Sequence, residues 1–406
     1  MTNWQEVKLD DICKINTETY SLDENLKYVN YLDTGNITSN RIENIQHIDL
    51  YVDKLPSRAR RKVKNGNIIY STVRPNQLHY GLIKEQPDNF LVSTGFAVLD
   101  IDTKKAIPEY VYYSLTQTIH TEALQAIAEQ STSAYPSIKS SDIGNRIIPL
   151  PPIDVQKKIA GVLGALDDKI ELNNKINNNL EQQAQALFKS WFVDFEPFGG
   201  KMPDDWKIGK LEDVVDVIMG QSPSGNSYNE KGRGCIFFQG RAEFGFRFPT
   251  IKLFTTEPRR MARQNDILMS VRAPVGDVNV AHEDCCIGRG LCAIRSKDNF
   301  QSFIFYTLWS VQNKLNIFNG EGTVFGSINK DSLNNLEIIV PNSNTIQKFE
   351  NLCSPMDNLI RKNYEENTRL SALRDTLLPK LMSGEIDVSN VDISALTSTD
   401  KLSFTE

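Results

Sequence analysis

The feature that most constrains this chain is an internal duplication, in which four blocks of sequence recur in the same order. A repeat on this scale indicates that one structural unit is present twice, and each copy consists of a globular part followed by a long helix. The paired blocks are NWQEVKLDDICKI (3–15) with DWKIGKLEDVVDVI (205–218), GNIIYSTVRP (66–75) with NDILMSVRAP (265–274), YPSIKSSDIGNRIIPLP (135–151) with FGSINKDSLNNLEIIVP (325–341), and LDDKIELNNKINNNLEQQAQAL (166–187) with MDNLIRKNYEENTRLSALRDTL (356–377).

Each globular part is predicted to mix strands and helices. Short β-rich runs bounded by Gly, Pro, Asn and Asp occur at 67–73 and 90–101 in the first copy, and at 266–272 and 286–295 in the second. Apolar residues at helical spacing follow at 109–128 and 300–318. The expected fold class is therefore α+β, built from two tandem globular parts.

The two long helices share an unusual pattern, because asparagine interrupts their apolar stripes at matching positions. Steps of four and three residues describe a coiled-coil seam in each helix. Paired asparagines in a seam cost stability but select one alignment, so we expect the two helices to pack on each other in a single register. The alternative is that these turns face water. The seam residues are Ile159, Leu163, Leu166, Ile170, Asn173, Asn177, Leu180, Ala184, Leu187 and Trp191 in the first helix, and Met356, Ile360, Asn363, Asn367, Leu370, Arg374, Leu377 and Leu381 in the second.

Bulk properties and motif searches exclude several classes of protein. The 406 residues exceed the size of one core, so two or more domains are expected. There is no run of 18 apolar residues and no signal-peptide pattern, which predicts a cytoplasmic protein without membrane insertion. Six scattered cysteines and four dispersed histidines do not have metal-ligand spacing. The stretch GQSPSGNS (220–227) lacks the lysine of a phosphate-binding loop, and no hydrolase, metalloprotease or dinucleotide motif occurs, so no catalytic residue and no metal site is predicted.

Basic residues favour nucleic-acid binding despite a net charge of −6, because they gather in the globular parts. Arginine suits bidentate contacts with guanine and phosphate, and asparagine or glutamine can read adenine. In the first copy the candidates are Arg58, Arg60, Arg61, Arg74, Asn76 and Gln77. In the second copy they are Arg233, Gln239, Arg241, Arg247, Arg259, Arg260, Arg263, Arg272 and Arg289. For any one of these arginines, solvated surface or a structural ion pair is the competing interpretation.

Several motifs resemble those of specificity subunits of type I restriction-modification systems. The stretch IIPLPPIDVQKKIAGVLGALDDKIELNN (147–174) is similar to the conserved helical region of that family, and SGEIDV (383–388) is similar to the end of its second conserved region. The W-x-x-x-K-L-x-D openings at Trp4 and Trp206 extend the resemblance over nearly the whole chain.

This resemblance implies two target-recognition domains separated by two long antiparallel coiled-coil helices, with pseudo-twofold symmetry. The expected divisions are target-recognition domain 1 (1–152), spacer helix 1 (153–198), target-recognition domain 2 (199–342), spacer helix 2 (343–383) and a C-terminal tail (384–406). At about 1.5 Å per residue, a helix of some 35 residues would be a rod of roughly 50 Å.

The resemblance further implies that the chain is not an enzyme but the DNA-reading subunit of a larger complex. Each recognition domain would read one half of a split, asymmetric target in double-stranded DNA. Two methyltransferase subunits would dock on the helices and supply S-adenosylmethionine, so this chain would bind no cofactor itself. An endonuclease or translocase subunit is a further candidate partner.

Arg74 and Arg272 are the leading candidates for DNA contacts, as residues at equivalent places in the two repeats. A second set comprises Tyr135, Ser137, Lys139, Phe325, Ser327 and Asn329, although Tyr135 and Phe325 could instead pack each domain against its helix. The helix pair and partner framework would rest on Leu163, Leu166, Ile170, Asn173, Asn177, Leu180, Ile360, Asn363, Asn367 and Leu370. Two other functions stay open: a scaffold that joins proteins without reading DNA, and a self-contained nuclease or methyltransferase, which the missing motifs disfavour.

Overall fold

The computed structural model describes residues 4–131, 135–320 and 326–392. The chain forms two compact units, Met1–Leu172 with Glu366–Glu406 and Asn173–Glu365, which are called unit 1 and unit 2 below. Each unit holds one globular domain together with a segment of each long helix, α4 (Ile153–Phe192) and α8 (Ser343–Met382). Each globular domain is therefore completed by a helix segment from the other repeat.

The globular domain of unit 1 is built on two four-stranded sheets, in the orders β6-β3-β10-β7 and β2-β11-β8-β9. Along β8, Ile68 and Tyr70 belong to the core shared with the helices, whereas Ile69 packs toward the other sheet. Because side chains alternate along a strand, the sheet that contains β8 is the middle layer. The strands are β1 (Gln5–Lys8), β2 (Cys13–Ile15), β3 (Tyr28–Leu32), β4 (Ile37–Thr38), β5 (Arg41–Ile42), β6 (Gln46–Asp49), β7 (Ala59–Lys62), β8 (Ile68–Ser71), β9 (Tyr80–Leu82), β10 (Phe90–Ser93), β11 (Phe96–Ile101) and β12 (Ile147–Leu150).

The globular domain of unit 2 repeats this plan, in the orders β15-β17-β16-β21-β18 and β14-β22-β19-β20. Ile267 and Met269 of β19 face the helix-bound core and Leu268 faces the other sheet, as in β8. The predicted mixture of α and β structure and the tandem repeat are confirmed, with β15 as an additional strand. The strands are β13 (Lys207–Lys210), β14 (Val215–Met219), β15 (Tyr228–Asn229), β16 (Cys235–Phe238), β17 (Leu253–Thr255), β18 (Met261–Ala262), β19 (Ile267–Ser270), β20 (Val278–Val280), β21 (Cys285–Ile287), β22 (Leu291–Ser296) and β23 (Glu337–Val340).

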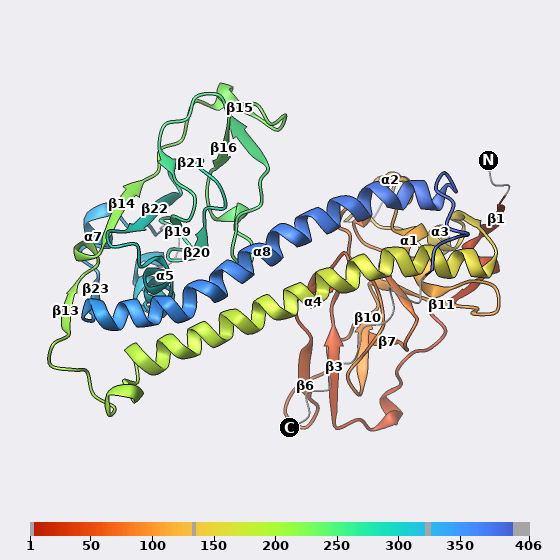
Figure 1. Ribbon diagram of the computed structural model, residues 1–406. Coiled ribbons are helices and arrows are strands. Elements are labelled where there is room, and N and C mark those ends of the chain that lie inside the picture. Colours follow the sequence, from red (N-terminus) through yellow and green to blue (C-terminus); the bar gives the residue numbers. More distant parts are fainter. Residues whose placement is uncertain (1–3, 132–134, 321–325, 393–406) are drawn as a thin grey trace. The chain divides into compact units, whose positions relative to one another are not determined.

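Short helices and a two-stranded sheet connect each domain to its long helix. β1 pairs antiparallel with β12, and β13 pairs in the same way with β23, so the recurring opening block lies beside the strand that leads into the long helix. Figure 1 shows α1 beside α4 in unit 1 and α5 beside α8 in unit 2. The short helices are α1 (Pro108–Leu115), α2 (Thr118–Glu129) and α3 (Ser140–Gly144) in the first copy, and α5 (Gln301–Ser310), α6 (Gln312–Leu315) and α7 (Lys330–Asn334) in the second.

The two long helices begin with different capping chemistry. Before α4 stand Pro151 and Pro152, and the buried side chain of Gln156 accepts a hydrogen bond from the Ile107 N–H (2.9 Å) and donates one to the Pro151 carbonyl (2.8 Å). Before α8, the side chain of Asn342 accepts a hydrogen bond from the Thr345 N–H (2.8 Å), as an N-cap residue does. Asn342 satisfies one of the N–H groups that the start of α8 leaves unpaired, whereas Gln156 instead ties the start of α4 to the residue that precedes α1.

The helix seams have the predicted pattern, because every seam position in both helices is buried or half-buried. In unit 2 the Asn363 Nδ2 donates a hydrogen bond of 2.8 Å to the Asn177 Oδ1, and the two residues are 8% and 4% exposed. The interpretation that these turns face water is therefore wrong for this pair. Paired amides inside an apolar seam satisfy each other only in one alignment, as the sequence predicted.

In unit 1 the helices are joined by charged pairs. Arg374 Nη1 of α8 lies 2.7 Å from Asp167 Oδ1 of α4, and Lys169 Nζ lies 3.4 Å from Glu366. Since the later residue of α4 contacts the earlier residue of α8, the two segments are antiparallel, and Figure 1 shows them side by side. Among the described helices, none is long and apolar enough to cross a membrane.

Candidate nucleic-acid interface

In unit 1, the predicted residues Arg74 and Tyr135 lie together. Val73 forms an isolated β-bridge with Ser137, and the Arg74 N–H donates to the Pro136 carbonyl at 2.9 Å. This pairing places the Arg74 guanidinium 5.0 Å from the centre of the Tyr135 ring, which is 59% exposed. Such exposure excludes a core-packing role for Tyr135. A cation beside an exposed ring suits contact with a phosphate or a base.

Three more predicted residues lie on the same two segments. Asn76 and Gln77 form the short 3₁₀ turn after Arg74 and are exposed. The turn is held from behind, because the Asn76 N–H donates to Gln125 Oε1 (3.2 Å) and the His79 ring is 3.2 Å from Gln77 Oε1. Lys139 is exposed just before α3, where its N–H donates to Asp142 Oδ2 at 2.7 Å. Residues 74–77 and 135–139 therefore form one polar surface.

The other basic segment of unit 1, residues 58–61, lies on a different sheet. Hydrogen bonds join it and the segment before Arg74 to the same turn, the one between β10 and β11. Arg60 and Arg61 are half-buried in β7, and Arg58 is exposed just before this strand. The Arg58 carbonyl accepts from the Thr94 N–H, and the Gly95 carbonyl accepts from the Thr72 N–H, both at 2.8 Å. The turn between β10 and β11 thus lies between the two basic segments.

In unit 2, the predicted equivalence of Arg74 and Arg272 is wrong by one residue. Arg272 forms the bridge with Ser327 that Val73 forms with Ser137, and the Ala273 N–H donates to the Gly326 carbonyl (3.0 Å) as Arg74 donates to Pro136. Arg272 is itself the bridge residue, whereas Arg74 follows the bridge in the left-handed region (φ 48°) at the start of a 3₁₀ turn, so the two arginines are not at equivalent places. Both Arg272 and Ser327 are exposed, whereas Phe325 lies outside the described residues.

Arg289 is a further candidate for DNA contact. From the sequence alone it is only one of the nine basic and polar candidates of the second copy. The Gly290 carbonyl accepts from the Val271 N–H (2.9 Å), as Gly95 does from Thr72, so the turn 288–290 matches the turn 94–95. Arg289 is exposed at this turn. A Cβ atom on Gly288 or Gly290 would lie 2.8 Å from the Gln239 carbonyl oxygen, which explains the two glycines. The available signal was the Gly-Arg-Gly pattern inside the predicted β-rich run 286–295, since paired glycines favour a turn.

Two predicted arginines of unit 2 have protein partners. Arg241 is exposed but pairs with Asp277. The prediction that Arg247 contacts DNA is wrong, because only 3% of its side chain is exposed. Its Nη2 lies between Glu181 and Asp357, at 3.4 Å from each. A guanidinium enclosed in this way cannot reach DNA. Here the competing interpretation, a structural ion pair, describes Arg247.

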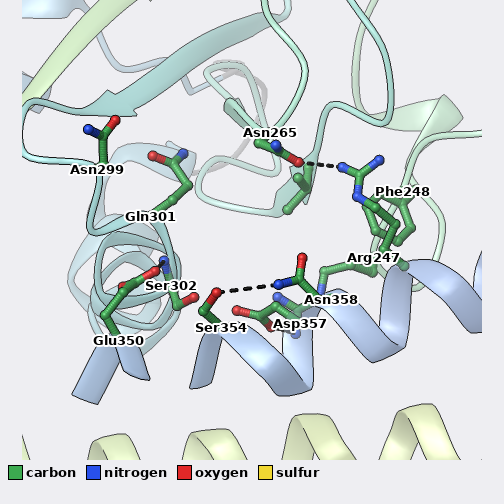
Figure 2. Close-up of a pocket in the computed structure, with 12 residues that line it drawn as sticks. Arg247, Phe248, Asn265, Asn299, Gln301, Ser302, Glu350, Ser354, Asp357 and Asn358 are labelled. Atoms are coloured by element: carbon green, nitrogen blue, oxygen red, sulfur yellow. Dashed lines mark hydrogen bonds and ion pairs between the residues drawn. The ribbon is translucent and has the colours of Figure 1, made fainter. Parts of the chain in front are cut away.

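Arg247 also lines a cavity of about 230 Å³ between the globular domain of unit 2 and α8, which Figure 2 shows. Charged groups around it are engaged with the protein. Arg361 Nη2 donates to Asn265 Oδ1, and the Glu350 carboxylate accepts from the Ser302 N–H at 3.1 Å. Burial raises the pKa of the Glu350 carboxyl, although the hydrogen bonds from the Ser302 and Phe303 N–H groups oppose this rise. The cavity is thus a packing feature of the domain on its helix.

Metal-binding and thiol chemistry are not supported by the described residues. No group of three or more His, Cys, Asp or Glu in this part of the chain could hold a metal ion. Cys292 lies inside the core of unit 2, where burial raises the pKa of its thiol to about 12 and keeps it protonated.

Comparisons with known proteins agree on one family. The model of the type I restriction modification DNA specificity domain matches residues 1–182 and 203–370. The chain is 31% identical to a Methanocaldococcus jannaschii protein described as the specificity subunit of type I restriction enzyme MjaX, over 95% of this chain and 94% of the relative. It is 26% identical to the type I restriction enzyme HindI specificity subunit of Haemophilus influenzae, over 95% of this chain and all of the relative. The crystal structure of a type I restriction-modification S subunit from M. genitalium has the same fold, with a TM-score of 0.57, 18% identity and coverage of 93% of this chain and 96% of that one.

Proposed function

The chain belongs to the type I restriction-modification DNA specificity family, and on that premise we propose that its two globular domains each read one half of a split DNA target. As a specificity subunit it recognises DNA and does not itself carry out the chemistry of the complex. The observation that carries the proposal is that both domains expose basic and polar side chains at corresponding turns. In unit 1 these are Asn76, Gln77, Tyr135 and Lys139, beside the half-buried Arg74, and in unit 2 they are Arg272, Arg289 and Ser327.

The two half-sites are expected to differ, because the corresponding surfaces carry different chemistry. At the bridge position unit 1 has Val73 where unit 2 has Arg272, and at the turn it has Thr94 where unit 2 has Arg289. Direct readout depends on which donors and acceptors reach the base edges, so unlike side chains select unlike bases. An asymmetric target follows.

Joining two weak readers makes their separation part of the specificity. When one domain is bound, the other is presented to DNA at a high effective concentration, but only if its half-site lies at the correct distance. The paired seams of α4 and α8 would set this distance. The gap between the half-sites is then recognised through the protein rather than through base contacts.

The partners of the proposed complex are two methyltransferase subunits, docked on the helical framework, and double-stranded DNA. S-adenosylmethionine would be bound by the methyltransferase, and an endonuclease or translocase subunit would complete a restriction assembly. Because its target is DNA, we place the complex in the cytoplasm. These assignments rest on the family and on the two-domain arrangement.

A gel-shift assay tests the proposal most directly. The chain is reconstituted with its methyltransferase and titrated with a duplex whose sequence comes from mapping the methylated positions in the host genome. The expected result is binding at least about a thousandfold tighter than to a shuffled duplex at the same salt concentration, the lower end of the usual specificity range. Equal binding to all duplexes would instead identify a scaffold that does not read DNA.

A further inference from the structure

A tyrosine–aspartate pair recurs where each globular domain meets its own long helix. In unit 1 the Tyr113 hydroxyl of α1 donates to Asp167 Oδ2 of α4 at 2.7 Å. In unit 2 the Tyr306 hydroxyl of α5 donates to Asp357 Oδ1 of α8 at 2.9 Å. The same contact therefore anchors both domains, and the two copies can be compared group by group.

The arginine that completes this pair comes from a different place in each copy. In unit 1 it is Arg374, a residue of α8, so the ion pair joins one helix to the other. In unit 2 it is Arg247, which lies in the globular domain between the 3₁₀ turn Arg241–Glu243 and β17. Of these two ion pairs, only the one in unit 2 links a segment of the recognition domain to the long helices.

Arg247 is held through one edge of its guanidinium and by stacking, while its buried Nε has no hydrogen-bond partner. Its Nη2 lies 3.4 Å from Glu181 of α4 and from Asp357 of α8, and it donates to the Tyr306 hydroxyl at 3.0 Å. The guanidinium carbon lies 3.9 Å from the centre of the Phe305 ring. One cation thus joins both long helices and α5, and a planar guanidinium can stack and pair at once, as an ammonium group cannot.

The backbone on either side of Arg247 is equally fixed. Its carbonyl accepts from the Val280 N–H at 2.8 Å. Gly245 exchanges two hydrogen bonds with the side chain of Asn279, at 3.0 and 3.1 Å. The residues next to this anchor reach the surface, since Phe246 is 40% exposed and Arg241 is exposed in the preceding turn.

From this geometry we infer that Arg247 is a positioning residue for DNA recognition: it fixes segment 241–248 of the second domain to both helices and so sets how that domain meets its half-site. This inference rests on the proposed function. Arg247 does not contact DNA, and its effect is transmitted through the segment it holds. Unit 1 has the corresponding ion pair within its helices, so its reading segments are not held by this device.

The test uses the reconstituted complex with Arg247→Lys, which keeps the positive charge but loses stacking and two-sided pairing. The matched control is Arg374→Lys, the same change in the corresponding ion pair of unit 1. Methylation rates are measured on the wild-type target, on targets with the gap changed by one base pair, and on targets with single changes in either half-site. Thermal unfolding of both variants measures how much stability each loses, so that a general loss of stability can be separated from a loss of discrimination.

For Arg247→Lys we expect at least a tenfold loss of discrimination against the wrong gap and against base changes in one half-site, with the other half-site read normally. Arg374→Lys should lower the melting temperature without this one-sided loss. If Arg247→Lys lowered every rate by the same factor, Arg247 would be only a stability residue and the inference would be overturned.

Two further results separate this inference from its premises. A reduced salt dependence of binding with unchanged gap discrimination would mean that Arg247 contacts a phosphate, which also overturns the inference. Failure of the proposed function has a distinct signature, because the wild-type complex itself would then show no preference for sequence or gap.

Discussion

Arg247 and Arg272 belong to the same unit and to the same predicted basic cluster, but their surroundings differ. Arg272 is exposed beside Ser327, while Arg247 has 3% of its side chain exposed and two carboxylates within 3.4 Å. An exposed guanidinium is available to phosphates and bases, whereas a buried one is bound to its protein partners. Substitutions at the two positions should therefore affect different properties.

Arg272→Ala should weaken binding to the cognate duplex while leaving the fold intact. If Arg272 reads a base, the loss should be about 1–3 kcal/mol, and specificity should relax at one position of one half-site. Fluorescence anisotropy with the reconstituted complex measures this loss. Lys207→Ala, an exposed change on β13, is the matched control. Unchanged affinity in a folded Arg272→Ala complex would remove this residue from the proposed interface.

Arg247→Ala should instead destabilise unit 2. The change leaves Glu181 and Asp357, whose side chains are 17% and 24% exposed, without their shared cation. Removing one partner of a buried ion pair typically costs about 3–5 kcal/mol, and the partial exposure here favours the lower end. Urea unfolding measures this cost, with Arg272→Ala as the control. A loss below about 1 kcal/mol would show that water replaces the arginine.

The destabilisation by Arg247→Ala should depend on pH. Burial raises the pKa of the Glu181 carboxyl, and Arg247 opposes that rise. Without Arg247 the folded-state pKa rises further, so folding favours the protonated acid. Stability is then retained below the unfolded pKa of about 4.3 and is lost as pH rises through the folded value. Unfolding free energies at pH 5 and pH 7.5 should differ more in the variant than in the wild type, and an equal pH dependence would contradict this account.

At the scale of elements, the seam of α4 and α8 combines apolar packing with a hydrogen-bonded pair of asparagine amides. Leu163 and Ile360 are almost fully buried, as a coiled-coil seam requires, whereas Asn177 and Asn363 are buried polar groups satisfied by each other. An aliphatic pair would pack more favourably but would tolerate sliding. The asparagines therefore lower stability in return for a single alignment, which fits the proposed role of the helices as a spacer.

A double-mutant cycle tests the role of this pair. Asn363→Leu alone leaves the buried Asn177 amide without its partner and should cost about 1–3 kcal/mol. Adding Asn177→Leu removes both amides, so the double variant should recover most of that loss or exceed the wild type. Thermal unfolding measures each step. Additive losses would mean that the two amides act independently.

At the scale of the whole molecule, the helices connect two readers whose folds match and whose surfaces differ. The two domains share one plan but differ at their exposed turns, so the proposed recognition sites differ although the framework repeats. Affinity then depends on both half-sites at once. The recognised gap should respond to the length of the helices in a regular way.

Inserting one heptad into both α4 and α8, between Leu172 and Asn173 and between Glu365 and Glu366, preserves the seam. Seven residues lengthen a helix by about 10.5 Å, which corresponds to roughly three base pairs of DNA. Mapping the methylated positions should show both half-sites unchanged and the gap altered by about three base pairs. A four-residue insertion, which breaks the heptad register, is the control and should abolish methylation. An unchanged gap would show that the helices do not set it.

The repeat, the two long helices and their seams followed from the sequence because they depend on local spacing. A seam recurs every three or four residues along one helix, so Leu163, Asn177 and Ile360 can be identified without knowing what they contact. The mixed composition of each domain was evident for the same reason. Arg74 and Tyr135 were found as candidates because their blocks recur in both copies.

Which arginines face solvent was decided only by the tertiary structure. Arg247 and Arg272 look alike along the chain, yet Arg247 is enclosed by Glu181, 66 positions before it, and by Asp357, 110 positions after it. The single-residue shift between Arg74 and Arg272 is different, because the paired blocks 66–75 and 265–274 already place Arg272 opposite Val73, and the bridges to Ser137 and Ser327 confirm that alignment. Burial and pairing are properties of contacts between distant segments, and local residue spacing contains no record of those contacts.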